Sequence, residues 1–191
     1  QSVLGEQWWH WLRGEDCHER PTHRRTVGHS HVLPPKLRSD DGARGVLVRL
    51  LHKAAMRLRR LDYWAARMVV SLSYTGGWPK WKETVYLGRC QDTPSMLKAL
   101  ERAWSKRPPG ARPIKVSITL FDLTPSRCTT PSLFVEERRA LQAARAMDAV
   151  NERFGANSVY FASMHETRDP APLRLAFKNI PVVTNEVGRG D

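Results

Sequence analysis

The chain has 191 residues, and its 31 Lys and Arg against 19 Asp and Glu give a formal net charge of +12. This length suits one domain with extensions and is sufficient to bury a hydrophobic core. The composition, 41% hydrophobic and 26% charged, is typical of a folded protein rather than a disordered tail. No stretch reaches the roughly 20 apolar residues of a membrane span, so we expect no transmembrane segment and no membrane partner.

Cysteine usage and the N-terminus indicate the compartment. Three widely spaced cysteines without a CxxC motif make a disulfide framework or a thiolate zinc site improbable, so a reducing, cytoplasmic location is expected. The start of the chain lacks a signal peptide and an initiator Met, which indicates a piece of a longer protein. One group of zinc-capable side chains has a spacing that fits no standard site, so no metal is expected there: Cys17, His18, His23, His29 and His31.

The positive charge is concentrated in two stretches. Residues 20–67 hold 12 basic residues against three acidic ones, and residues 80–115 hold nine against three. A local basic excess of this kind is typical of a protein that binds a polyanion. The alternative is a protein whose arginine side chains are merely solvated.

The N-terminal third predicts two helices with a strand between them. A short helix over residues 1–16 carries Trp8, Trp9 and Trp11 and ends at Gly14. After a polar linker, HRRTVGHSHVLPP has the character of a strand stopped by prolines, although Val27 shares its parity with polar residues. The strongest periodicity predicts an amphipathic helix from about Gly42 to Trp64. Its apolar face is Leu47, Leu50, Leu51, Ala54, Leu58 and Leu61, and its expected solvated face is Arg49, Lys53, Arg57 and Arg60.

Alternating apolar and polar residues then predict a hairpin. Its first strand runs from Met68 to Thr75, Gly76 and Gly77 end it, and a second strand covers Thr84–Gln91 beyond a loop at residues 78–81. Thr93 and Pro94 open a second helix with Met96, Leu97, Leu100 and Trp104 on one face. Alternation over residues 114–121 predicts a last strand.

The order strand, helix, strand, strand, helix, strand predicts an α+β fold. This βαββαβ arrangement is ferredoxin-like: a four-stranded antiparallel sheet with two helices on one face and the other face open for binding. A helix–strand extension follows. Its helix over residues 131–154 is expected to pack through Ala143, Met147, Val150 and Phe154, and residues 157–161 are expected to form a short strand.

Several segments resemble the Y-family, UmuC/DinB-like lesion-bypass DNA polymerases. The run RRTVGHSHVLPP after a helix ending LRGED resembles their junction between thumb and little finger, and IKVSITLFDLTP resembles the closing little-finger strand. The segment PSLFVEERRALQAARAMDAVNERFGANSVYFAS is similar to the C-terminal extension of the UmuC-like branch. The resemblance, which covers about Val3 to Phe161, implies four parts. They are the end of the thumb (1–16), a linker (17–22), the little-finger DNA-binding domain (23–123) and a C-terminal extension (124–191).

The function that the resemblance implies is sequence-independent binding of double-stranded primer-template DNA during error-prone translesion synthesis, in DNA repair of the SOS damage-response type. Phosphate contacts suit such a task, since they position a protein without reading bases. The first strand and the edge of the last strand offer cations, hydroxyls and a glycine that lets backbone approach a phosphate. The predicted DNA-binding residues are Arg24, Arg25, Thr26, Gly28, Ser30, Arg112, Lys115, Ser117 and Thr119.

No catalytic residue is predicted in this chain. Two-metal nucleotidyl transfer needs a carboxylate cluster, and the adjacent pair Asp40 and Asp41 suits the start of a helix instead. The resemblance implies that magnesium is bound in a palm domain of a parent DNA-directed DNA polymerase, with no cofactor in the present residues.

Two other functions and one further partner stay open. The fold order is shared with RNA-recognition domains, although the first strand lacks their aromatic pattern. A catalytically inactive polymerase homologue acting as an adaptor in mutagenesis would carry the same C-terminal region. Leu173 to Val183 is a candidate contact with a sliding clamp, without a recognisable clamp-binding pattern.

Overall fold

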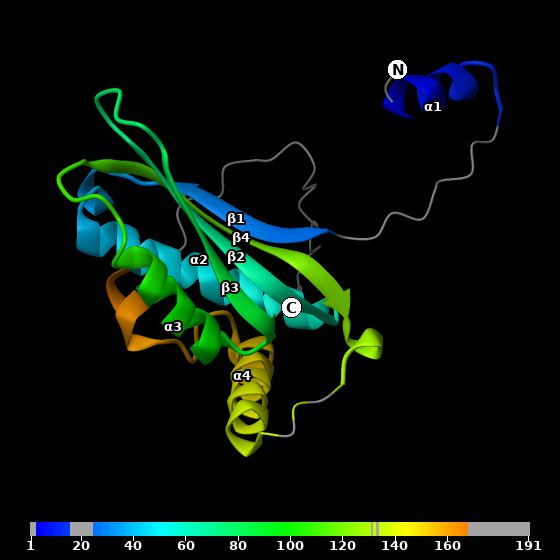
Figure 1. The fold of residues 1–191 in the computed structure, drawn as a ribbon. Helices are drawn as coiled ribbons and strands as arrows, with labels where there is room; N and C mark the ends of the chain where they lie inside the picture. The colour runs from blue at the N-terminus through cyan, green and yellow to red at the C-terminus, as the bar shows by residue number, and fades with distance from the viewer. Residues whose placement is uncertain (1–2, 16–24, 131, 133, 168–191) are drawn as a thin grey trace, which may run out of the picture.

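Four antiparallel strands and four α-helices form the described part of the chain, which in this computed structural model comprises residues 3–15, 25–130, 132 and 134–167 (Figure 1). In chain order the elements are α1 (Val3–Trp11), β1 (Thr26–Val32), α2 (Asp40–Arg60), β2 (Tyr63–Tyr74), β3 (Trp81–Cys90), α3 (Thr93–Trp104), β4 (Pro113–Pro125) and α4 (Val135–Phe154). Short 3-10 turns lie at Pro35–Leu37, Ser126–Cys128 and Ala162–Thr167.

The sheet has the order β1-β4-β2-β3, and all its neighbouring strands are antiparallel. Each helical crossover, β1 to β2 through α2 and β3 to β4 through α3, passes over one intervening strand, which is the split-βαβ arrangement. Both crossover helices lie on the same side of the sheet (Figure 1). The predicted α+β fold, with one covered and one open sheet face, is confirmed.

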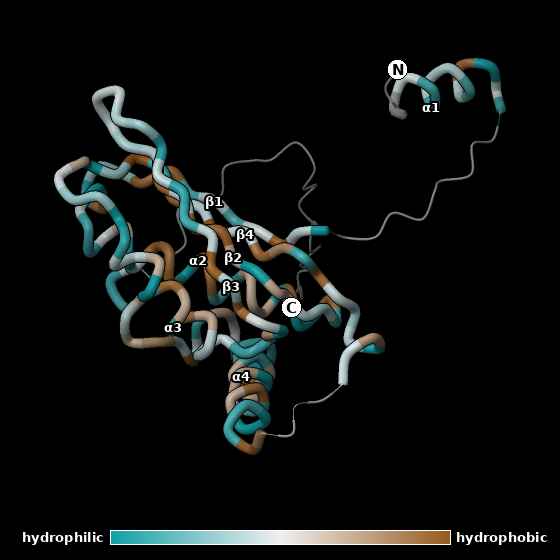
Figure 2. Tube along the Cα trace, in the orientation of Figure 1, coloured by the Kyte–Doolittle hydropathy of each residue, from teal (hydrophilic) through white to brown (hydrophobic). Residues whose placement is uncertain are grey.

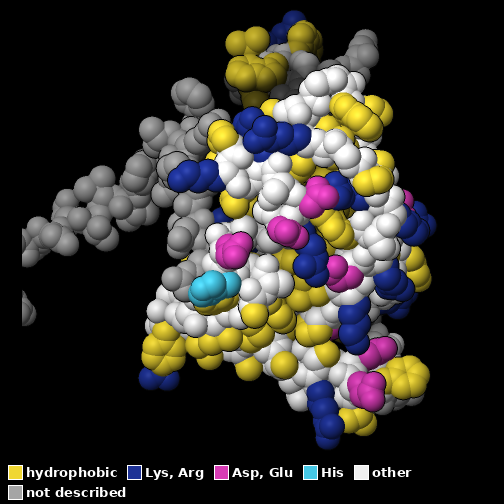
Figure 3. Space-filling view, turned by 90° about the vertical axis from the view of Figure 1, so that its left-hand side faces the viewer, with side chains coloured by type: hydrophobic (Ala, Val, Ile, Leu, Met, Phe, Trp, Pro, Cys, Tyr) yellow, Lys and Arg dark blue, Asp and Glu magenta, His cyan; other side chains and the backbone are white. Residues whose placement is uncertain are grey.

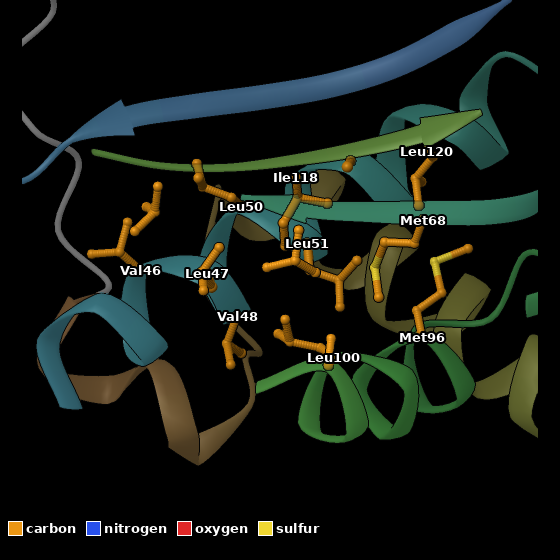
Figure 4. Packing of buried hydrophobic residues seen from close by; sticks show 14 of the residues in the cluster. Val46, Leu47, Val48, Leu50, Leu51, Met68, Met96, Leu100, Ile118 and Leu120 are labelled. Atoms are coloured by element: carbon orange, nitrogen blue, oxygen red, sulfur yellow. The ribbon is translucent and has the colours of Figure 1, made fainter. Parts of the chain in front are cut away.

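The hydrophobic core lies between the sheet and these two helices. Figure 4 shows side chains of α2 meeting those of β2, β4 and α3, and the hydropathy colouring of Figure 2 shows hydrophobic stretches along the packed elements. The predicted apolar face of α2 is buried from Leu47 to Leu58, and Leu61 packs partly buried against it. The other large hydrophobic core residues, each at most 1% exposed, are Leu33, Met68, Leu72, Met96, Leu100, Ile118, Leu120 and Met164.

Both ends of α2 differ from the prediction. The helix begins at Asp40, because the Ser39 side chain caps it by accepting a hydrogen bond from the Gly42 amide at 3.1 Å. It ends at Arg60 rather than Trp64, and Asp62 adopts a positive φ of 56° in the tight turn that follows. Trp64 therefore belongs to β2, where the aromatic and β-branched residues after the turn favour a strand.

The strands are longer than their alternation indicates. β2 starts at Tyr63 instead of Met68, β3 starts at Trp81 inside the predicted loop, and β4 continues to Pro125. In the β2–β3 pair the alternation of apolar and polar residues is interrupted by a shift in register. The shift lies between Ala65 and Arg67, where β3 carries extra residues around Gly88. Gly88 has a φ of 72°, which a residue with a side chain rarely adopts.

The two terminal helices also differ in detail. α1 ends at Trp11, three residues before the positive-φ Gly14 at which the sequence predicts its end. In α4 the predicted packing face is partly wrong: Met147 and Val150 are half-buried, but Ala143 and Phe154 are exposed, and the buried residues are Ala144 and Asn151.

The short strand predicted at residues 157–161 does not form. Instead, Asn151 of α4 brings this segment back onto the helix through its side-chain amide. Its Nδ2 donates to the Val159 carbonyl and its Oδ1 accepts from the Val159 amide, both at 2.9 Å. Among the residues that the structure describes, no helix combines the length and apolarity that crossing a membrane requires.

Candidate nucleic-acid interface

The open face of the sheet is polar along β4. Val116, Ile118 and Leu120 alternate toward the helices and are fully buried, so Lys115, Ser117 and Thr119 occupy the open side, as the sequence predicts. Lys115 is exposed, and the two hydroxyl-bearing residues are half-buried by their neighbours. This strand therefore contributes one cation and two hydroxyls to a single surface.

β1 continues the same surface. Thr26, Gly28 and Ser30 are exposed on the open side, with Gly28 opposite Thr119 and Ser30 opposite Ser117. The awkward parity of Val27 is explained by its burial at 2% exposure, because it faces α2 together with the half-buried His29 and His31. Six of the nine predicted residues therefore lie together on the open face: Thr26, Gly28, Ser30, Lys115, Ser117 and Thr119.

The other three predicted residues are arginines near the strand ends. Arg25 is exposed immediately before β1. Arg112 is exposed just before β4, and its carbonyl accepts a hydrogen bond from the Thr75 amide at 3.0 Å, which fixes it beside the end of β2. Arg24 lies outside the described residues, as do Cys17, His18, His23 and the segment from Leu173 to Val183.

β4 is an internal strand of the sheet. β4 lies between β1 and β2, so its backbone is hydrogen-bonded on both sides and only its side chains can reach a ligand. The edge belongs to β1. The Leu33 amide donates to the Ile114 carbonyl at 2.7 Å, and along an antiparallel pair every second residue has its amide turned toward the partner strand. The odd-numbered residues of β1 therefore face β4 with their amides, and the amides of Gly28 and Ser30 point away from β4.

The glycine at position 28 is needed for the packing of β1 against β4. A Cβ at this position would lie 2.9 Å from the Ile118 carbonyl oxygen and 2.9 Å from Thr119 Oγ1, closer than ordinary packing allows. β1 and β4 can therefore approach closely only because position 28 has no side chain. The same absence leaves the outward amide of Gly28 open to an approaching anion.

Sequence reasoning missed the contribution of β2 and β3 to this face. Arg67, Val69, Ser71 and Ser73 of β2 are in register with open-face residues of β4, and the hydroxyls of Ser71 and Ser117 lie 2.6 Å apart. β3 adds three exposed residues, Lys82, Thr84 and Tyr86. Their alternation was available as a signal, but the sequence does not tell which strands lie beside β4.

The basic face predicted on α2 is partly buried. Arg49 is only 8% exposed and donates from Nη1 to the Thr167 carbonyl at 2.7 Å, so its solvated role is wrong. Arg60 is exposed but pairs with Glu152 at 3.0 Å, and Lys53 and Arg57 are exposed. On the side of the molecule that Figure 3 shows, Lys and Arg are likewise interspersed with Asp and Glu.

Two half-buried or buried histidines on the covered side of the sheet, His29 and His52, lie near basic side chains. Burial lowers the pKa of His29 below its ordinary value of 6.5, and the charges of Lys53 and Arg57 lower it further. The pKa of His52 on α2 is lowered in the same direction by burial and by Arg59, against an opposing effect of Asp148. Since the fold holds these imidazoles neutral, the unfolded chain takes up protons first on acidification, and stability falls below about pH 6.5.

Replacing Lys53 with methionine is expected to raise the pKa of His29. The native and unfolded values then lie closer together, so less stability is lost between about pH 7 and pH 5. An NMR titration of the His29 ring, with urea midpoints at the same pH values, measures both effects. Lys98→Met, an exposed lysine on α3, is the control and should change neither; an unaltered His29 titration in Lys53→Met would contradict the electrostatic cause.

Metal ligation has no support among the residues that the structure describes, where no group of three or more His, Cys, Asp or Glu side chains could hold an ion. The residues of the open face instead offer hydroxyls, outward amides and cations. This combination can hold phosphate oxygens without contacting bases.

Comparisons with known proteins follow the same part of the chain. Residues 24–133, more than half of the chain, match the impB/mucB/samB family C-terminal domain. A search of curated proteins finds no match.

Many solved structures are similar, among them the following three. A complex of the beta-clamp processivity factor and the little finger domain of PolIV has a chain that is 17% identical, with a TM-score of 0.43 over 58% of this chain and 97% of that one. The Y-family DNA polymerase chimera Dbh-Dpo4-Dbh is 10% identical with a TM-score of 0.47 over 65% of this chain. The insertion ternary complex of Dbh DNA polymerase is 10% identical with a TM-score of 0.41, also over 65% of this chain. The matched region spans 36% of each of the latter two chains.

Proposed function

Because this chain belongs to the impB/mucB/samB C-terminal domain family of Y-family polymerases, we propose that it binds primer-template DNA as the little-finger module of a lesion-bypass polymerase. In this role the module holds the duplex while a separate active site extends the primer. It has to accept any sequence, damaged or intact, and therefore has to contact the sugar-phosphate backbone rather than base edges.

The observation that carries the proposal is the paired register of β1 and β4. Gly28 faces Thr119, Ser30 faces Ser117, and Lys115 stands next in the row opposite Val32. The strip thus supplies hydroxyl donors and one ammonium group on a flat surface, and the outward amides of β1 run along its edge. The exposed Arg25 and Arg112, which immediately precede β1 and β4, add positive charge at the ends of the strip.

Nucleotide transfer belongs, in this proposal, to another part of the parent polymerase. The adjacent carboxylates Asp40 and Asp41 occupy the first turn of α2, where they suit the positive end of the helix dipole, and Asp40 forms a short ion pair with Arg107. They are thereby committed to the fold. Magnesium ions for the reaction would be held by a palm domain, with this module acting on substrate position alone.

The proposal is tested by fluorescence-anisotropy titration of the whole chain with four probes at several salt concentrations. The probes are a primer-template duplex, the same duplex with an unrelated sequence, matched single-stranded DNA and an RNA hairpin. We expect both duplexes to bind equally, with log K falling steeply and linearly with log salt because phosphate contacts release counterions. Preference for the RNA hairpin, a strong difference between the duplex sequences, or no binding at low salt would overturn it.

A further inference from the structure

Exposed aromatic and basic side chains line β3, at the edge of the sheet opposite β1. Lys82, Thr84 and Tyr86 share the parity that faces the open side, and all three are exposed. Tyr86 is 70% exposed, which is unusual for a tyrosine in the middle of a strand. Trp78, 52% exposed, and the exposed Lys80 precede them in the β2–β3 turn. We call these five residues the β3 track.

The cations of this track are not neutralised by the acidic residue of the same strand. Glu83 has the opposite parity, and its carboxylate accepts a hydrogen bond from Lys106 of the following helix end at 2.7 Å, on the covered side of the sheet. The neighbouring Arg67, opposite Tyr86 on β2, pairs with Asp122 at 3.2 Å, so the excess positive charge comes from Lys80 and Lys82. The track therefore combines aromatic faces with excess positive charge.

The β3 track is separate from the strip that β1 and β4 form, because β2 lies between them. Adjacent strands are roughly 5 Å apart, so the track lies roughly 10 Å from β4, the nearer strand of the strip, and roughly 14 Å from β1. Lys82 and Tyr86 are four residues apart on one face, which spans roughly 13 Å along the strand. An ammonium group and an aromatic ring at this spacing can contact a phosphate and a base of one extended strand.

We propose that the β3 track binds unpaired, single-stranded DNA, with bases stacked on Tyr86 and Trp78 and phosphates paired with Lys80 and Lys82. Stacking needs a free base face, which a duplex does not offer within its grooves, whereas aromatic side chains beside a basic groove are how proteins hold single strands of any sequence. The proposal rests on the proposed function in taking DNA as the nucleic acid. It adds a second site, for the unpaired strand that a primer-template carries beyond the duplex.

The test compares the Trp78→Ala/Tyr86→Ala double variant of the whole chain with the wild type. Anisotropy is measured with a short single-stranded oligonucleotide and with a blunt duplex at one salt concentration. We expect about a tenfold or greater loss of affinity for the single strand, from lost stacking, and less than about a twofold change for the blunt duplex. In the wild type, 2-aminopurine placed in the single strand should be quenched on binding, and the double variant should abolish the quenching.

Two further variants separate stacking from damage to the fold. Tyr86→Phe keeps the ring and should retain single-strand binding, and Phe154→Ala removes another exposed aromatic, 67% exposed at the end of α4, and should change neither affinity. Equal losses for single strand and duplex, no loss for the single strand, or a preference for single-stranded RNA would overturn the β3 proposal. The blunt-duplex affinity of the wild type judges the proposed function independently of these outcomes.

Discussion

Replacing Arg59 with methionine is expected to lower the free energy of unfolding by about 3–5 kcal/mol, as breaking one partner of a buried ion pair does. The guanidinium donates to both carboxylate oxygens of Asp148, at 2.6 and 2.8 Å, and to the Gln91 carbonyl at 2.7 Å. Its side chain is 5% exposed and that of Asp148 is 19% exposed. Methionine keeps most of the aliphatic volume but leaves a largely buried carboxylate without its cation. Urea unfolding followed by circular dichroism measures the loss.

The neighbouring Arg60 provides the matched control. It also pairs with a carboxylate of α4, Glu152, but both side chains are more than half exposed. Arg60→Met should therefore cost less than about 1 kcal/mol. In the Arg59→Met background, Asp148→Leu should restore part of the stability because it removes the stranded charge. Equal effects of Arg59→Met and Arg60→Met would show that Arg59 does not tie α4 to the domain.

The ion pair between Arg59 and Asp148 could not be predicted from the hydrophobic periodicity of α2. The apolar face of α2 follows from the spacing of its leucines, because one stripe must turn to the core whatever it packs against. Arg49 and Arg59 lie off that stripe; the periodicity assigns Arg49 to solvent and assigns no role to Arg59. They are buried because residues far along the chain, Thr167 and Asp148, cover them. No local pattern on α2 signals that cover.

The open face shows the same division. Alternation in β4 correctly divides Val116 and Ile118 from Lys115 and Ser117, since each strand has two faces and one is buried. The order of the strands across the sheet cannot be predicted from this alternation. It alone decides that β4 is internal, that β1 presents its amides at an edge, and that Tyr86 lies far from Gly28. In β1 the two histidines obscured the alternation, because they are polar residues on the covered face.

Reversing three charges around the β1–β4 strip is expected to weaken duplex binding about a hundredfold or more at moderate salt. The variant carries Arg25→Glu, Arg112→Glu and Lys115→Glu, all at exposed positions that border or occupy the strip. If each cation neutralises one phosphate, the slope of log K against log salt should fall in magnitude by about three, since each contact contributes about 0.9. The loss should be the same for unrelated duplex sequences, because backbone contacts carry no sequence information.

A control with the same change in net charge tests whether position or total charge is responsible. Lys53→Glu, Arg57→Glu and Lys98→Glu alter three exposed cations of α2 and α3, the helices on the covered side of the sheet. Long-range attraction depends on total charge and is screened beyond roughly 10 Å at 0.1 M salt, so this variant should lose little affinity and keep the steep slope. Matching losses in the two triple variants would mean that DNA is attracted by the overall charge. A changed sequence preference with an unaltered slope in the strip variant would place base contacts, rather than phosphate contacts, on the open face.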